Sequence, residues 1–322
     1  METRDSALRR TEWKVFGTVL LTLLCVEVGL RVLESRLSLD VRYVREIPER
    51  AADLAQADGC RVLFIGNSLT NRGVDEAVVQ AELAERAGVP VQVDKVHQSG
   101  SRLVEWYRIY ERFYAGAERA PDLMVVGFAM SQLEDSPTRT GELARLGHLY
   151  TTAYETPDVF RHDATSFGQR TEFLLSKLSV SFALREKVSQ AFLEITVPNY
   201  KQSALWVNRE QRLSRARDTA GRHATYDRLG RMVALAERSG TEVVAVTMPT
   251  LEPDGRASLG DLIQQQGATH IDARVIPGLT DADFADGVHL GPTGATRYSQ
   301  YIARELARRL PEACGASSSA SV

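Results

Sequence analysis

Two short stretches of the sequence carry residue types that could together perform nucleophilic chemistry. The first is the tripeptide Gly-Asn-Ser at 66–68, which directly follows the apolar run 62–65 and presents the hydroxyl of Ser68. The second contains Asp286 and His289 with two residues between them. A histidine oriented by a carboxylate can take the proton of a serine hydroxyl and make it a nucleophile. Each stretch alone also fits a plainer interpretation, an ordinary strand-to-helix turn or a polar surface loop.

The elements that must hold these residues alternate between strands and helices. Short apolar runs bounded by turn residues predict strands, and apolar positions at intervals of three and four predict amphipathic helices. Strands are expected at 61–66, 91–96, 121–128, 241–249 and 269–273. Helices are expected at 74–87, 102–117, 225–240, 258–266 and 293–310. This alternation predicts a parallel sheet with helices on both of its faces.

The two stretches are expected to meet at one edge of that sheet. Ser68 follows the first strand, while Asp286 and His289 lie between the last strand and the last helix. Both places belong to the C-terminal edge of the strands, where open parallel sheets bind their ligands. The combination therefore favours a nucleophilic Ser68 over a plain turn.

These motifs resemble those of the SGNH (GDSL-like) hydrolase superfamily. Residues 66–69, Gly-Asn-Ser-Leu, are similar to its first block, and residues 286–290, Asp-Gly-Val-His-Leu, are similar to its last. The resemblance covers about 60–128 and 224–310. It implies a flavodoxin-like three-layer α/β fold with a parallel sheet. It also implies that Ser68 is the nucleophile, that His289 is its base, and that Asp286 orients the imidazole.

The resemblance further implies donors for the oxyanion that forms during acyl transfer. One is the backbone N–H of Ser68, and another is the backbone N–H of Gly100, for which a plain turn is the alternative interpretation. Asn67 stands where the family has Asp, which removes a carboxylate but keeps a residue that tolerates tight turns. His97, close to the same edge, is expected to be structural rather than catalytic.

The third motif of the family is incomplete in this chain. The family pattern is Gly-x-Asn-Asp after the third strand; Gly127 matches it, but Ala129 occupies the position of the oxyanion asparagine. An alanine side chain has no donor, and losing one such donor typically slows the reaction by about 10²–10³-fold. Either Ser131 or Gln132 replaces the donor, or the site is slower or specialised.

Composition places the chain among ordinary folded proteins. Its 322 residues are 43% hydrophobic and 25% charged, and the net charge of −3 gives no general attraction to nucleic acid. The six histidines are scattered, and no His, Cys and Asp group has metal-ligand spacing, so neither a metal nor a cofactor is expected. The segment GNSLTNRG matches neither a dinucleotide-binding motif nor a P-loop, which disfavours a nucleotide-binding domain.

An apolar segment near the N-terminus predicts a membrane anchor. Basic residues precede the apolar run 15–26, which continues to Leu33 with only Glu27 and Arg31 charged. About twenty helical residues can cross a bilayer, and Glu27 and Arg31 are one turn apart, where they can pair. A cleaved signal peptide or a lipoprotein signal at Cys25 fits less well, because the small residues needed for processing are missing. The basic residues predict a cytoplasmic N-terminus and a periplasmic or extracellular domain beyond the cell membrane.

The expected organisation has four parts. They are the cytoplasmic tip and anchor at 1–36, a stalk or short helix at 37–59, an SGNH-like domain at 60–311 with a helical insertion at 131–222, and a disordered tail at 312–322. In an α/β layout the last helix runs back toward the start of the strands. Cys60 and Cys314 could therefore form a disulfide in an oxidising compartment.

The outward-facing anchor, the incomplete third motif and the insertion together resemble membrane-anchored members of the superfamily. Those members serve polysaccharide O-acetylation and D-alanyl transfer to teichoic acids. The resemblance implies an acyl esterase or O-acyltransferase that acts through an acyl-Ser68 intermediate on cell-envelope or exported polysaccharide. A glycan or acylated sugar would be its substrate, and a multi-pass membrane acyltransferase is one partner to consider. The alternative is a catalytically weak or inactive domain that binds glycans or organises an assembly; Ala129 favours it, and the intact Ser68, Asp286 and His289 disfavour it.

Overall fold

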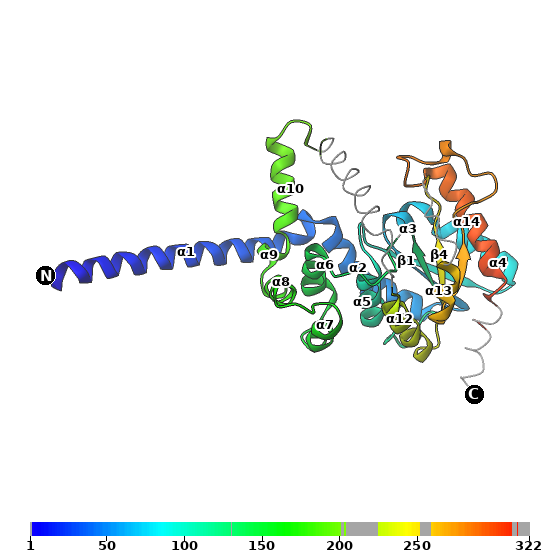
Figure 1. Cartoon of the computed structure of the whole chain (residues 1–322), viewed down its shortest axis with the longest axis horizontal. Coiled ribbons are helices and arrows are strands. Elements are labelled where there is room, and N and C mark those ends of the chain that lie inside the picture. The colour runs from blue at the N-terminus through cyan, green and yellow to red at the C-terminus, as the bar shows by residue number, and fades with distance from the viewer. Residues whose placement is uncertain are drawn as a thin grey trace. The chain divides into compact units, whose positions relative to one another are not determined.

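The computed structural model describes most of the chain and groups it into two compact units. The described residues are 2–129, 131–200, 203, 225–251, 259–310 and 314. One unit comprises residues 1–44 together with 139–222, and the other comprises residues 45–138 together with 223–322. We call the first the helical unit and the second the α/β unit, and describe each by itself. Figure 1 shows the elements of both.

The α/β unit is built on a five-stranded sheet in which every pair of neighbouring strands is parallel. The strands are β1 (Cys60–Gly66), β2 (Val91–His97), β3 (Leu123–Phe128), β4 (Glu242–Thr247) and β5 (Thr269–Asp272). Their order in the sheet is β2-β1-β3-β4-β5. This is the flavodoxin-like order of a doubly wound sheet, which confirms the fold class predicted from the sequence.

Helices on both faces of the sheet complete three layers. They are the second part of α2 (Leu39–Gln56), α3 (Ser68–Gly73), α4 (Glu76–Ala87), α5 (Leu103–Phe113), α12 (Asp227–Arg238), α13 (Leu259–Gln265) and α14 (Pro292–Ala307). The 3-10 turn η2 (Asp281–Asp283) precedes α14. Helix α14 lies beside α4, and α12 lies beside α5.

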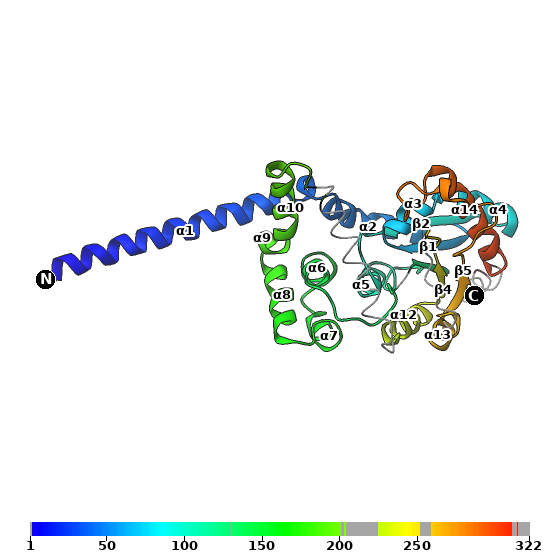
Figure 2. The same cartoon turned by 45° about the horizontal axis from the view of Figure 1, so that its top comes forward.

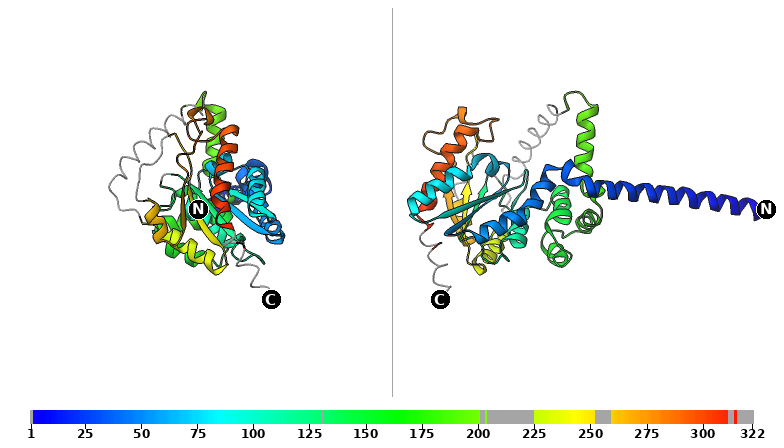
Figure 3. Two further views of the ribbon diagram at one scale, coloured as in Figure 1. Left: turned by 90° about the vertical axis from the view of Figure 1, so that its right-hand side faces the viewer. Right: turned by 180° about the vertical axis from the view of Figure 1, so that it is seen from behind.

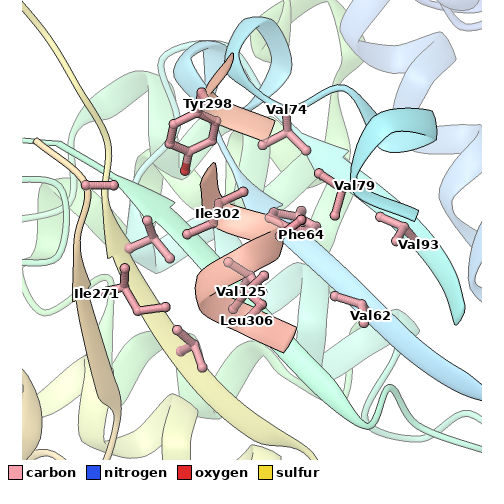
Figure 4. Close-up of a cluster of buried hydrophobic side chains, with 14 of the residues drawn as sticks. Val62, Phe64, Val74, Val79, Val93, Val125, Ile271, Tyr298, Ile302 and Leu306 are labelled. Atoms are coloured by element: carbon pink, nitrogen blue, oxygen red, sulfur yellow. The ribbon is translucent and has the colours of Figure 1, made fainter. Parts of the chain in front are cut away.

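Helix α14 contributes to the core beneath it through apolar residues that are one helical turn apart. Tyr298, Ile302 and Leu306 recur at intervals of four along α14, and all three are buried. They belong to one buried apolar cluster with the β1 residues Val62 and Phe64 (Figure 4). Fully burying a side chain of this size contributes about 1.5–3 kcal/mol, so this one stripe fixes α14 on the sheet.

Helix α2 occupies most of the segment 37–59, for which a stalk or a short helix was expected. Ile47, Ala51 and Leu54 lie on one face of it, at intervals of four and three, and all three are buried. Because an apolar stripe of this kind gains stability only by packing, this part of the predicted stalk is a packed helix of the α/β unit.

The insertion after β3 is mainly helical within the residues that the structure describes, as predicted. Its elements are α6 (Thr140–Arg145), the π-helical turn η1 (Leu146–Tyr150), α7 (Thr156–His162), α8 (Phe167–Leu178), α9 (Val180–Ala183) and α10 (Arg185–Thr196). The helical unit begins at residue 139 rather than at 131, because Asp135 belongs to the α/β unit. In that unit the Asp135 carboxylate accepts a hydrogen bond of 2.6 Å from the backbone N–H of Asp227. This bond connects the segment that leads into the insertion to the segment that follows it.

The helical unit also contains the N-terminal helix α1 (Glu2–Leu37). Its segment Glu12–Arg36 is long and apolar enough to cross a membrane, and most of its side chains are exposed. Length and composition therefore agree with the expected anchor.

A disulfide joins Cys60, at the start of β1, to Cys314. This confirms the pairing that the α/β layout made possible. Cys314 packs against the sheet core, so this residue is not part of a free tail. The other residues of the predicted disordered tail, 312–313 and 315–322, lie outside the described residues.

Candidate active site

Ser68, His289 and Asp286 form one continuous hydrogen-bonded chain at the C-terminal edge of the sheet. The Nε2 atom of His289 lies 2.8 Å from the Oγ atom of Ser68. On the other side of the ring, Nδ1 lies 2.9 Å from Oδ2 and 3.0 Å from Oδ1 of Asp286. The fold thus brings together residues that are 221 positions apart in the sequence. The arrangement is that of a nucleophile, a base and a group that orients the base.

The turn that presents Ser68 is fixed by a cap and by two close backbone approaches. Strand β1 ends at Gly66 and α3 begins at Ser68, where the Asn67 side chain caps the helix by accepting a hydrogen bond of 2.9 Å from the backbone N–H of Leu69. A Cβ atom at Gly66 would lie 2.0 Å from the Oγ1 atom of Thr70, and one at Gly127 would lie 2.5 Å from it. Only glycine fits at both positions, because Thr70 packs between the ends of β1 and β3. Asn67 thus serves as a helix cap, which explains why Asn suffices there.

The loop that carries Asp286 and His289 is folded tightly on itself. Gly287 has a φ of +77°, a left-handed conformation that glycine adopts without strain. That turn lets the Asp286 carboxylate accept hydrogen bonds from the backbone N–H groups of Val288 (3.2 Å) and His289 (2.8 Å). The backbone N–H of Ala285 donates to the carbonyl of His289 at 2.8 Å and closes the loop. Spacing of three therefore places the carboxylate against the imidazole through local contacts alone.

The charge of Asp286 is supported by this loop. Partial burial by itself would raise the pKa of Asp286, but the hydrogen bonds from the backbone and side chain of His289 and from the backbone of Val288 outweigh it. Together with the charge of His289, they lower the pKa of Asp286 below its ordinary value. The carboxylate is thus ionised at neutral pH and can stabilise an imidazolium.

Arg72 is a residue of this site that the sequence analysis missed. Its Nη1 atom lies 3.4 Å from Oδ2 of Asp286. The available signal was its position in α3, four residues after Ser68 and therefore on the same side of the helix. Both side chains are about half exposed, so this ion pair is worth little in stability, but it adds a positive charge beside the carboxylate.

Gly100 lies in a loop held next to the start of α3. The backbone N–H of Gln98 donates to the carbonyl of Gly66 at 3.2 Å, and the Nδ2 atom of Asn67 donates to the carbonyl of Ser101 at 3.4 Å. Gly100 has a φ of +70°, so glycine is required by backbone conformation and not by lack of space. Within the described chain, the N–H groups of Ser68 and Gly100 donate to no other protein group. Both are therefore available as donors.

The third predicted donor position has a specific local structure. The backbone N–H of Ala129 donates to Oε1 of Gln132 at 2.9 Å, so that the carbonyl end of this amide is held and its Nε2 end is left to donate elsewhere. The carbonyl oxygens of both Ser131 and Gln132 also accept hydrogen bonds, from the Arg102 guanidinium and from the backbone N–H of Leu103 respectively. The Gln132 amide is therefore oriented beside Ala129, and both Gln132 and Ser131 stay candidates for the third donor.

Two further predictions of the sequence analysis concern His97 and metal binding. His97 is the last residue of β2 and pairs in register with Gly66, and its structural role stays a prediction. Among the described residues, no group of three or more His, Cys, Asp or Glu side chains could hold a metal ion.

No family model matches the chain, and no curated protein matches it either. Among solved structures, the chain is similar to the acetylxylan esterase Axe2 from Geobacillus stearothermophilus, with 13% identity, a TM-score of 0.39, and coverage of 79% of this chain and 96% of that one. It is similar to a lipase/acylhydrolase from Enterococcus faecalis at 14% identity and a TM-score of 0.39, over 77% of this chain and 96% of that one. It is also similar to LAE5, an alpha/beta hydrolase enzyme from the metagenome of Lake Arreo, at 14% identity and a TM-score of 0.37, over 81% and 98%.

Likenesses of this size carry no conclusion about activity. The resemblance to the SGNH hydrolases depends instead on the motifs and on the strand order of the sheet. The positions of Ser68, Asp286 and His289 at one sheet edge agree with that resemblance.

Proposed function

We propose that this protein is an SGNH-type serine acyl esterase or O-acyltransferase that forms an acyl intermediate on Ser68. The observation that carries the proposal is the position of the His289 ring, with Nε2 at 2.8 Å from the Ser68 hydroxyl and Nδ1 at 2.9 Å from Asp286. An imidazole held in this way can accept the serine proton at one nitrogen while the carboxylate stabilises the charge at the other.

The reaction balances with these three residues and an ester. The Oγ atom of Ser68 attacks the acyl carbon while its proton passes to Nε2 of His289. The ester C–O bond then breaks, the leaving alcohol takes that proton, and the acyl group stays on Ser68. Water or a sugar hydroxyl next gives its proton to Nε2 of His289 while its oxygen attacks the acyl carbon of the acyl-serine. The bond between that carbon and Oγ of Ser68 then breaks, Oγ takes the proton back from His289, and the free acid or the acylated sugar leaves. Water as the acceptor makes the protein an esterase, and a sugar hydroxyl makes it a transferase.

The oxyanion of each tetrahedral intermediate would be held by the N–H groups of Ser68 and Gly100. Support comes from the absence of another protein acceptor for either group within the described chain. We assign the third donor to Nε2 of Gln132, in place of the side chain that Ala129 lacks. A donor placed at the end of a longer side chain is less well fixed than an asparagine, so we expect slower turnover than with a complete third motif.

The proposed setting is the outer side of the cell membrane, with a glycan or acylated sugar as substrate. An apolar span at Glu12–Arg36 with basic residues ahead of it supports the orientation. The disulfide between Cys60 and Cys314 supports an oxidising compartment. A multi-pass membrane acyltransferase would be the natural source of acyl groups at that surface, and exported polysaccharide would be their acceptor.

The direct test measures covalent labelling of the full chain in detergent and its turnover of an activated acetyl ester. Wild-type protein is incubated with a fluorophosphonate and with 4-nitrophenyl acetate, beside Ser68→Ala and beside Ser189→Ala as a matched control at an exposed serine. We expect the label to map to Ser68, and turnover to fall by at least about 10³-fold in Ser68→Ala but not in Ser189→Ala. Adding a polysaccharide fragment as acceptor then separates transfer from hydrolysis, since only transfer gives an acetylated oligosaccharide in the mass spectrum.

The second candidate function is glycan binding without catalysis. Ala129 favours it, because its side chain cannot replace the missing donor. Equal turnover by wild-type protein and Ser68→Ala, with no label on Ser68, would refute the enzymatic proposal and support this alternative.

A further inference from the structure

Glu27 is a carboxylate in the apolar span of α1 that is bound by another helix of the same unit. It accepts hydrogen bonds from the hydroxyls of Ser179 and Ser181, both at 2.9 Å. It also accepts hydrogen bonds from the backbone N–H groups of Val180, at 2.7 Å, and Ser181, at 3.1 Å. Arg31 adds an ion pair of 3.2 Å. The start of α9 is therefore held against α1 at the position of Glu27.

That level lies inside the apolar span and not at its end. A helix needs about twenty residues to cross the hydrocarbon core, so a span that starts near Lys14 ends near Leu33. Glu27 is six residues before that end, which at 1.5 Å per residue is about 9 Å deeper. Because Glu27 holds the start of α9, α8 ends and α10 begins close to this level of α1.

The helices next to α9 carry apolar side chains that the helical unit leaves exposed. On α8 and α10 these side chains recur at intervals that place them on one face of each helix: Phe167, Leu174 and Leu178 on α8, and Val188, Phe192 and Ile195 on α10. Exposure is large, reaching 87% at Phe167, 72% at Leu178 and 85% at Ile195. Other side chains of the same segment, such as Phe173 and Val180, are buried within the unit. The exposed set is thus a second apolar face, which we call the α8–α10 face.

The helices of this face lie across the direction of the span. Figure 2 shows α8, α9 and α10 in one layer, with α1 extending from that layer. In Figure 1 and in the right-hand view of Figure 3, α10 runs crosswise to α1. If α1 crosses a bilayer, helices crosswise to it lie along the bilayer surface, which is the position of interfacial amphipathic helices.

We propose that the α8–α10 face is a membrane-binding surface that contacts lipid acyl chains at the outer boundary of the bilayer. Three observations support a lipid occupant: the Glu27 hydrogen bonds join the start of α9 to the apolar span, the apolar side chains of α8 and α10 are exposed, and α10 runs crosswise to α1. In this arrangement Glu27 has its hydrogen bonds inside the protein, which removes the cost of a bare carboxylate in the membrane.

The test measures lipid contact at single positions of the full chain in vesicles of phosphatidylethanolamine and phosphatidylglycerol. Cys25→Ser removes the one unpaired cysteine of the described chain, and Cys60 and Cys314 are bonded to each other. An environment-sensitive NBD label is then attached at Leu178→Cys or at Phe192→Cys. The controls are Gln190→Cys, an exposed polar position on α10, and Val275→Cys, an exposed position of the α/β unit.

We expect the labels at 178 and 192 to show blue-shifted emission, strong quenching by doxyl-labelled lipid and weak quenching by iodide. Labels at 190 and 275 should show the reverse. Glu27→Ala should lower the lipid quenching at 178 while the protein still floats with the vesicles. The measurement contains no enzymatic readout, so its outcome is independent of the proposed acyl chemistry.

Three results would overturn the proposal. One is a chain that does not float with vesicles, and another is quenching at 178 and 192 equal to that of the controls. The third is shielding of these positions in native membranes but not in protein-free vesicles, which would assign the face to a membrane protein partner. Unchanged lipid quenching at 178 in Glu27→Ala would refute the role given to Glu27.

Discussion

Removing the Cys60–Cys314 disulfide should strongly destabilise the α/β unit. The bond links residues separated by 254 positions, from the first strand to the segment after α14. If disulfides act by restricting the unfolded chain, closing a loop of this length contributes about 5.5 kcal/mol at 25 °C. Measured effects are usually smaller than this entropic value, so we expect a loss of about 2–5 kcal/mol in the free energy of unfolding.

The assay is urea unfolding of the full chain in detergent, followed by near-ultraviolet circular dichroism. The double variant Cys60→Ala/Cys314→Ala is compared with wild-type protein in the presence and absence of dithiothreitol. With an m-value of about 2–3 kcal/mol/M, the unfolding midpoint should fall by about 1–2 M. Alanine is used because Cys60 is buried and a serine hydroxyl would lack a defined partner there. Cys25→Ser is the matched control and should leave the midpoint unchanged.

Two results would refute this reasoning. A midpoint shift below about 0.3 M in the double variant would mean that the bond does not constrain the unfolded chain as calculated. Titration of two reactive thiols at Cys60 and Cys314 in protein isolated from the cell would mean that the bond does not form there, and would remove one support for the extracytoplasmic setting.

Three further predictions concern the site and its scaffold. Asp286→Asn should keep the acceptor for the backbone N–H groups but place an amide against Nδ1 of His289, and turnover should fall by about 10²–10⁴-fold with little change in KM; an unchanged kcat would remove Asp286 from the mechanism. Gln132→Ala should lower kcat by about 10²–10³-fold while Ser131→Ala should not, and the reverse ranking would assign the donor to Ser131. Burial lowers the pKa of His270, more than the charge of Asp272 raises it, so the native protein binds fewer protons than the unfolded chain below the ordinary pKa of 6.5. Stability should therefore fall from about pH 6.5 down to the lowered pKa, and His270→Gln should show a smaller drop in Tm between about pH 7.5 and 5.5; equal drops would contradict this origin.

Local patterns in the sequence were sufficient for the parts of the protein that neighbouring residues decide. The apolar run 62–65 followed by the tripeptide 66–68 predicts a strand that ends in a turn, because burial and turn chemistry act within a few residues. Asp286 and His289 could be paired from their spacing alone, since one tight loop at Gly287 brings them together. The spacing of Tyr298, Ile302 and Leu306 predicts α14 for the same reason. These are short-range effects that a single sequence carries.

Contacts between residues far apart in the sequence could be seen only in the tertiary structure. The contact between His289 and Ser68 spans 221 residues, and it exists because the sheet order brings the ends of β1 and of the loop before α14 to one edge. Helix α2 packs on the α/β unit because the apolar face that contains Ile47 is buried in its core. The Glu27 carboxylate accepts hydrogen bonds from residues of α9 that lie 153 and 154 positions later in the sequence. Periodicity reveals which face of a helix is apolar, but it does not reveal what will cover that face, because the partner is chosen by the packing of the complete fold.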